Sequence, residues 1–164
     1  MPTALVIHIH SPCTMTRVTL EETQGPGHGE DFATLAAYVK DYRAGGYDVD
    51  TVTESVCTGC GGRAFEIGVD DEAGCAERLC VACDDAVLIA DSADHWSEAE
   101  PSQCECPCGG VEFAIAVGFA PVGDGSDDVR WVSIGLRCLR DGMLGVYTDW
   151  RIDYSPSGHL RGGA

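Results

Sequence analysis

The fold class of this 164-residue chain follows from residues 57–69, which read Cys57-Thr58-Gly59-Cys60-Gly61-Gly62-Arg63-Ala64-Phe65-Glu66-Ile67-Gly68-Val69. A degenerate copy follows as Cys106-Pro107-Cys108-Gly109-Gly110-Val111-Glu112-Phe113-Ala114-Ile115-Ala116-Val117. When Cys60 is set on Cys108, the glycine pairs and three later apolar positions coincide. Apolar residues alternate in both copies, which is typical of strands with one buried face. The sequence therefore predicts two antiparallel β units, each opened by a cysteine turn.

The first copy carries a regular pair of cysteine turns. Cys57-x2-Cys60 is followed, after nineteen intervening residues, by Cys80-x2-Cys83. Two such turns joined by a hairpin direct four thiolates toward one ion, at a spacing typical of zinc sites. We therefore expect one structural zinc, bound by Cys57, Cys60, Cys80 and Cys83.

The second copy is irregular at its cysteines. Its alternating positions hold Cys104, Cys106 and Cys108, and Cys138 lies thirty residues after Cys108. The position that corresponds to Cys83 is then Asp141. Because a carboxylate is a legitimate zinc ligand, a second zinc would be bound by Cys106, Cys108 and Cys138, with Cys104 or Asp141 as the fourth ligand.

The sequence also allows a second copy without metal. The same alignment places Glu105, which is not a thiol, opposite Cys57. Cys138 ends an alternating apolar strand, where a free cysteine behaves as a small hydrophobic residue. Both interpretations, a second metal site and a degenerate one, stay open at this stage.

These patterns divide the chain into four parts. Residues 1–50 form an N-terminal α/β segment, with strands expected at 3–10 and 17–23 and one amphipathic helix at 31–43. Zinc-ribbon-like repeat 1 spans 51–97 and repeat 2 spans 104–154. Residues 155–164, rich in glycine and serine, are expected to be a flexible tail. The predicted class is mainly β (α+β).

Charge narrows the range of partners. The chain has 27 acidic and 10 basic residues, a formal net charge of -17. Such a surface repels phosphate backbones and anionic lipids, so neither nucleic acid nor a membrane is an expected partner. The apolar fraction of 45% argues against disorder.

Cysteine content indicates the compartment. The early apolar run 4–7 is interrupted by His8 and has no basic leader, so we expect neither a signal peptide nor a membrane span. In the resulting cytoplasmic location, ten cysteines favour metal ligation over disulfides.

Residues 55–92, and more weakly 104–150, resemble the zinc-ribbon and rubredoxin-like family, whose C-x2-C-G turns sit on antiparallel hairpins. The resemblance implies a structural metal held by the four cysteines of repeat 1. Rubredoxins hold iron, but Val81-Ala82 replaces their proline-containing turn and Asp84 replaces their glycine. Zinc is therefore the expected metal. The acidic chain lacks the basic faces with which many zinc ribbons bind nucleic acid.

A second resemblance supports a different function. Residues 106–111 resemble the C-x-C-G-x-V start of the glutathione-dependent formaldehyde-activating family, which implies a zinc enzyme acting on a thiol or small molecule at the second site. The later cysteine triplet of that family is reduced here to Cys138. His28, in a glycine-rich loop, is a further candidate for acid–base chemistry. A metal-handling or redox protein that uses all ten thiols is a third possibility.

Aromatic and acidic residues gather near the end of repeat 2. Aromatic side chains beside carboxylates make surfaces suited to proteins or cations. We expect partner binding at Tyr147, Asp149, Trp150 and Tyr154. The leading interpretation is a small acidic zinc-binding protein with a structural metal and a protein-recognition role, and the alternative is the zinc enzyme or metal-handling protein.

Overall fold

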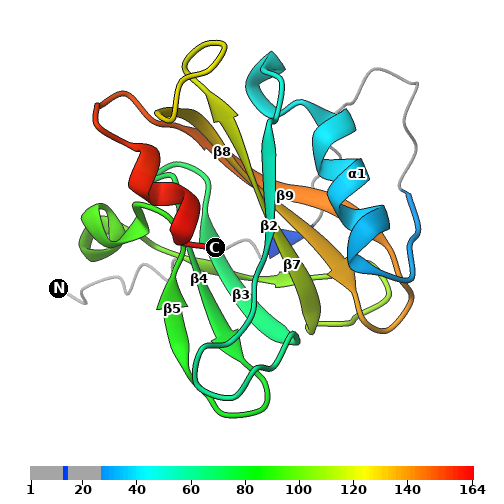
Figure 1. The fold of residues 1–164 in the computed structure, drawn as a ribbon. Helices are drawn as coiled ribbons and strands as arrows, with labels where there is room; N and C mark the ends of the chain where they lie inside the picture. Colours follow the sequence, from blue (N-terminus) through cyan, green and yellow to red (C-terminus); the bar gives the residue numbers. More distant parts are fainter. Residues whose placement is uncertain (1–12, 15–26) are drawn as a thin grey trace, which may run out of the picture.

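The computed structural model describes residues 13–14 and 27–164 (Figure 1). The strands expected at 3–10 and 17–23 lie outside these residues. The described chain is mainly antiparallel β with one α-helix, as predicted. Its strands are β1 (Cys13–Thr14), β2 (Thr51–Glu54), β3 (Phe65–Asp70), β4 (Cys75–Cys80), β5 (Ala86–Leu88), β6 (Ser102–Glu105), β7 (Phe113–Pro121), β8 (Val129–Cys138) and β9 (Leu144–Arg151).

The strands form one sheet with the order β1-β6-β3-β7-β8-β9. β4 pairs with β3 and with β5, while β2 pairs with β7. The strands of both predicted repeat units, β3–β5 and β7–β9, therefore belong to the same sheet. β7 and β8 are long strands in which most residues are buried, as expected for strands that are covered on both faces.

One row of residues crosses four strands of this sheet. Phe65 of β3 pairs with Cys80 of β4 on one side and with Phe113 of β7 on the other. Phe113 in turn pairs with Cys138 of β8. Both hairpins consequently end at the same level, and each ends at a cysteine.

The helix α1 (Phe32–Tyr42) confirms the expected helix at 31–43. The Asp31 carboxylate caps it by accepting a hydrogen bond from the Thr34 N–H at 2.9 Å, and the Asp31 N–H donates to the Thr34 hydroxyl oxygen. Leu35 and Val39 are fully buried against the sheet. The helix ends at Tyr42, and its C-cap residue Arg43 has a left-handed φ of 50° before the 3-10 turn η1 (Ala44–Gly46).

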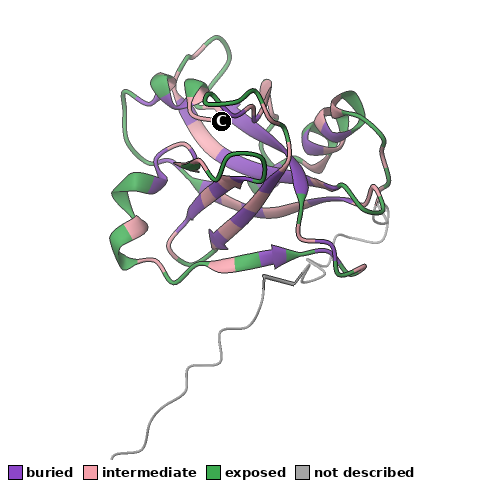
Figure 2. Ribbon diagram, turned by 90° about the horizontal axis from the view of Figure 1, so that it is seen from below, coloured by how far each residue is buried: buried purple, intermediate pink, exposed green. Residues whose placement is uncertain are grey.

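The long strands β7 and β8 are mostly buried, whereas β2, β5 and β6 are partly exposed, as the mixed colours of Figure 2 show. One face of β7–β9 packs against α1, and Gly135 permits this close approach because a Cβ there would collide with Val39. The other face carries the main core, which includes the fully buried Phe65, Phe113 and Phe119.

The C-terminal residues form part of this core. The segment for which the sequence predicts a flexible tail contains the 3-10 turn η4 (Gly158–Gly162), and Leu160 is buried in the main cluster. The Ser157 hydroxyl is buried and bonds to the backbone of Val129 at 2.8 and 3.1 Å. Two further 3-10 turns, η2 (Ser92–Asp94) and η3 (Trp96–Glu98), connect β5 to β6.

Candidate metal centres

The first cysteine group is made by two backbone turns that face each other. Before β3, the Cys57 N–H donates to the Gly62 carbonyl at 2.8 Å, and the Gly61 N–H donates to the Cys57 carbonyl at 2.8 Å. Gly61 has a φ of 74°, which a glycine adopts without steric cost. After β4, the Asp84 N–H donates to the Cys80 carbonyl at 2.9 Å. Each turn presents two sulfurs toward the other turn.

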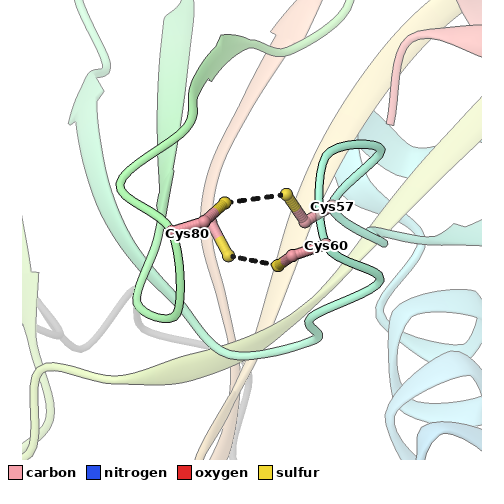
Figure 3. Close-up of side chains that lie close together, drawn as sticks. Cys57, Cys60 and Cys80 are labelled. Carbon is pink, nitrogen blue, oxygen red and sulfur yellow. Dashed lines mark hydrogen bonds between the residues drawn. The ribbon is translucent and has the colours of Figure 1, made fainter.

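The sulfur positions match a four-coordinate metal. Cys57 Sγ lies 3.5 Å from Cys83 Sγ, and Cys60 Sγ lies 3.6 Å from Cys80 Sγ. Figure 3 shows Cys57 and Cys60 on one turn facing Cys80 on the other. All four ligand atoms lie within 4.8 Å of one another. A tetrahedron with metal–sulfur bonds of about 2.3 Å places its sulfurs about 3.8 Å apart, so this group could hold a metal ion.

Within the first group, the thiols of Cys80 and Cys83 differ in pKa. Burial opposes ionisation of Cys80, but the N–H groups of Ala82 and Cys83 and the adjacent thiols lower its pKa to about 7. The Asp85 N–H lowers the pKa of Cys83, yet the thiols of Cys57 and Cys60 outweigh it and raise that pKa to about 12. The Cys80 thiol therefore ionises more readily than the Cys83 thiol, and a bound dication would offset the repulsion between their thiolates.

The second cysteine group repeats the same turns with a shorter first turn. The Cys106 N–H donates to Gly110 O at 2.8 Å, as that of Cys57 does to Gly62. After β8, the Gly142 N–H donates to the Cys138 carbonyl at 2.9 Å, as that of Asp84 does to Cys80. Cys106 therefore occupies the place of Cys57, for which the sequence alignment offers Glu105.

Asp141 completes the second group. Cys108 Sγ lies 3.6 Å from Cys138 Sγ, and Cys106 Sγ lies 3.6 and 3.7 Å from the two carboxylate oxygens of Asp141. In a tetrahedral centre with a metal–oxygen bond of about 2.0 Å, a sulfur and an oxygen lie about 3.5 Å apart. Of the two fourth ligands that the sequence allows, the structure brings Asp141 to the three cysteines. Cys104 belongs to the buried core and pairs through β6 with β1.

Asp141 is prepared to act as an anionic ligand. The Met143 N–H donates to its Oδ1 at 3.0 Å, and this bond, followed by the neighbouring thiols, lowers the pKa of Asp141. Burial raises the pKa of Cys106 to about 12. The group could hold a metal ion once its thiols lose their protons.

A hollow of about 510 Å³ adjoins the second group. Cys138 and Asp141 line it together with His28, Glu30 and Arg137. His28 reaches this position through an isolated antiparallel bridge to Met143. The hollow brings the candidate acid–base residue His28 to the same region as two ligands of the second group.

A second hollow, of about 520 Å³, contains most of the predicted partner-binding residues. Asp149, Trp150 and Tyr154 line it, beside Trp131. Tyr147 is not part of it, and its ring packs edge-on against Phe113 at 5.6 Å. The carboxylates of the hollow come from three separate segments and are Asp71, Glu72, Asp91, Asp94, Asp149 and Asp153.

Two of these carboxylates hold the aromatic rings in place. The buried Asp91 accepts the Trp150 indole N–H at 2.9 Å and the Tyr154 hydroxyl at 3.2 Å. Asp149 accepts the Trp131 indole N–H at 2.8 Å. Burial raises the pKa of Asp149; Trp131 lowers it, and the charge of Asp71 raises it further. We name this aromatic and acidic surface the Trp150 hollow.

One buried charge was missed by sequence reasoning. Arg78 of β4 is 3% exposed, and it packs its guanidinium 4.8 Å from the centre of the Phe65 ring. It occupies an inward position of the strand between the buried residues Ala76 and Cys80. This alternation is visible in the sequence and marks Arg78 as a charged residue at a core position.

Comparisons with family models, with curated proteins and with solved structures found no match. The fold and the two groups therefore define the class of protein by themselves. This class is a mainly β protein with two cysteine-rich groups that could bind metal. Within residues 13–14 and 27–164, no helix has the length and apolar character needed to cross a bilayer.

Proposed function

We propose that this chain is a zinc-binding protein whose metals are structural and whose partner is another protein. The observation that carries the metal assignment is the tetrahedral spacing of two donor sets presented by equivalent backbone turns. Zinc fits both sets, since it accepts thiolates and carboxylates alike and imposes little geometry of its own. A reducing compartment, the cytoplasm, keeps such thiols available for metal.

The test of this assignment is metal content per chain, measured by elemental mass spectrometry on protein purified without a tag. We expect two zincs. Cys80→Ser and Cys138→Ser should each retain one, whereas Cys75→Ser, a buried cysteine outside both groups, should retain two. Wild-type protein that contains neither zinc nor another metal after purification without chelators would falsify the assignment.

The proposed recognition role uses the Trp150 hollow. Three aromatic side chains and six carboxylates line one opening, a combination that suits a basic segment of another protein. Nothing in the composition suits an anionic partner, since the net charge is -17. We therefore propose a cationic peptide as the ligand.

Recognition can be tested with a lysine- and arginine-rich peptide by titration calorimetry. Tyr154→Ala should weaken binding at least about fivefold through the loss of an exposed anchor. Asp124→Asn changes the net charge by one outside the hollow and should leave the affinity within about twofold. Equal effects of both variants would mean nonspecific attraction and would contradict the role of the hollow.

A second candidate function is a zinc enzyme acting at the second centre. The hollow beside Cys138 and Asp141 favours it, because a substrate that enters there would approach the metal from the side on which Asp141 lies. Replacement of zinc by cobalt would report such access. A change in the cobalt absorption of the second centre on addition of a small thiol supports the enzyme, and an unchanged spectrum supports a closed structural metal.

A further inference from the structure

Arg78 is a buried cation whose hydrogen bonds are incomplete. Its Nη2 donates to the Val56 carbonyl at 3.4 Å. Within the described part of the chain, neither Nε nor Nη1 has a hydrogen-bond partner. Taking a guanidinium out of water without an opposite charge is costly. Its position therefore indicates a nearby anion that the side chains alone do not supply.

The contacts of Arg78 place its guanidinium near the backbone that carries the first cysteine group. Its Nη2 bonds to Val56, the residue before Cys57. Its guanidinium covers the ring of Phe65, which pairs directly with Cys80. Arg78 and Cys80 lie two residues apart on β4, so their side chains leave the same face of the strand.

The loaded first centre provides the missing anion. Four thiolates and one zinc dication sum to a charge of -2, whereas protonated thiols carry none. The loaded centre therefore places more negative charge near Arg78 than the unloaded group does. A fixed cation at this place favours the loaded state over the unloaded one.

We propose that Arg78 is the counter-charge of the first metal centre and raises its affinity for metal. This inference rests on the proposed function, because it requires a metal at the four cysteines. Arg78 touches no metal, so its role is that of a positioning residue that acts through charge. The exposed cations near the same turns are screened by water and contribute little.

The second centre serves as an internal control. Cys80 and Cys138 are separated by three strand spacings along one row, about 14 Å. The charge of Arg78 is therefore felt more weakly at Cys106, Cys108, Cys138 and Asp141. Loss of Arg78 should lower the affinity of the first centre much more than that of the second.

The experiment is a competition titration with a chelator on the full chain loaded with cadmium-113. The two centres give separate NMR signals because their donor sets differ. Arg78→Met should weaken cadmium binding at the first centre by about 10–100-fold, the range typical of residues that support metal ligands. Arg78→Lys, which keeps the charge, should recover a large part of this loss.

Arg63→Met is the matched control for the change in net charge. Arg63 follows the same turn, is 62% exposed at its side chain and pairs with Glu54 at 3.2 Å. Its loss should change the affinity by less than about twofold. Circular dichroism of each unloaded variant separates failure to fold from loss of metal.

Three results would overturn the inference. Arg78→Met with wild-type affinity shows that the charge is irrelevant. Equal losses in Arg78→Met and Arg78→Lys show that the guanidinium acts by packing or hydrogen bonding rather than by charge. A wild-type chain that binds cadmium at neither group overturns the proposed function itself, and is distinguished from the first two results by the absence of any signal to titrate.

Discussion

The first and second cysteine groups have nearly the same backbone and different candidate ligands. In each, an N–H of the first cysteine bonds to a glycine carbonyl, and a residue in left-handed conformation follows the last ligand, Asp84 with φ 60° or Gly142 with φ 78°. The ligand before that residue is Cys83 in one group and Asp141 in the other. The turns therefore determine where the donor atoms lie, while the chemical nature of one donor is free to change.

This comparison separates two sources of metal affinity. The geometry comes from backbone hydrogen bonds, which do not depend on the ligand side chains, and both groups share it. The remaining difference comes from the donor, because a carboxylate oxygen is harder than a thiolate and binds zinc less tightly than sulfur does in this setting. We expect the first centre to bind more tightly and the second to exchange its metal faster.

Removal of both metals should have the largest effect. Stripping the protein with a strong chelator should lower the midpoint of thermal unfolding by at least about 10 °C, since structural zinc contributes directly to folding. Far-UV circular dichroism during heating measures this change, with the same sample after zinc is restored as the control. An unchanged unfolding curve after verified metal loss would contradict a structural role.

Loss of a single buried thiol should affect one centre at a time. Cys80→Ser should unfold at a lower temperature than Cys138→Ser, because the four-thiolate centre contributes more than the mixed one. Differential scanning calorimetry of the zinc-loaded variants makes the comparison. The reverse order of the two midpoints would show that the second centre is the stronger support.

Exchange of the one ligand that differs should reverse the ranking of the two centres. Asp141→Cys should slow zinc release from the second centre by about tenfold, and Cys83→Asp should accelerate release from the first by a similar factor. Stopped-flow transfer of zinc to a coloured chelator resolves the two phases. If neither rate of zinc release changes, exchange is governed by access from the hollow beside Asp141 and not by the donor atom.

The left-handed residue of each turn should produce the smallest change. Gly142→Ala combines a positive φ with a Cβ 2.8 Å from the Gly29 carbonyl oxygen, so we expect a loss of about 2 kcal/mol. Asp84→Gly relieves a milder strain and should gain about 0.5 kcal/mol. Denaturant unfolding of the loaded proteins measures both, and a gain from Gly142→Ala would show that the loop of Gly29 yields.

Local sequence patterns predicted the helix, several strands and the two cysteine groups of this molecule. The alternation of apolar residues placed β3, β7 and β8 correctly, because a strand with a buried face has a period of two. The apolar stripe of α1 identified the helix. Local patterns of this kind depend on few neighbours in the sequence.

What the sequence could not predict depends on contacts between distant segments. The alignment assumed equal turn lengths and therefore placed Glu105 opposite Cys57. In the structure the second turn is one residue shorter, so that the predicted ligand Cys106 takes the place of Cys57. Asp91, which follows β5, accepts a hydrogen bond from the Trp150 indole on β9, fifty-nine residues later in the chain. The C-terminal segment reads as polar and flexible, but Ser157 and Leu160 find buried partners on β8 and in the core.

The pairing of Phe65 with Phe113 has a consequence for the origin of the sheet. Each phenylalanine lies five residues after a cysteine of its own group, and the two strands that carry them run antiparallel. Equivalent residues opposed in this way are related by a local two-fold axis, the symmetry of an isologous dimer. Residues 89–101 connect the two hairpins covalently, so this junction forms within one chain and does not depend on protein concentration.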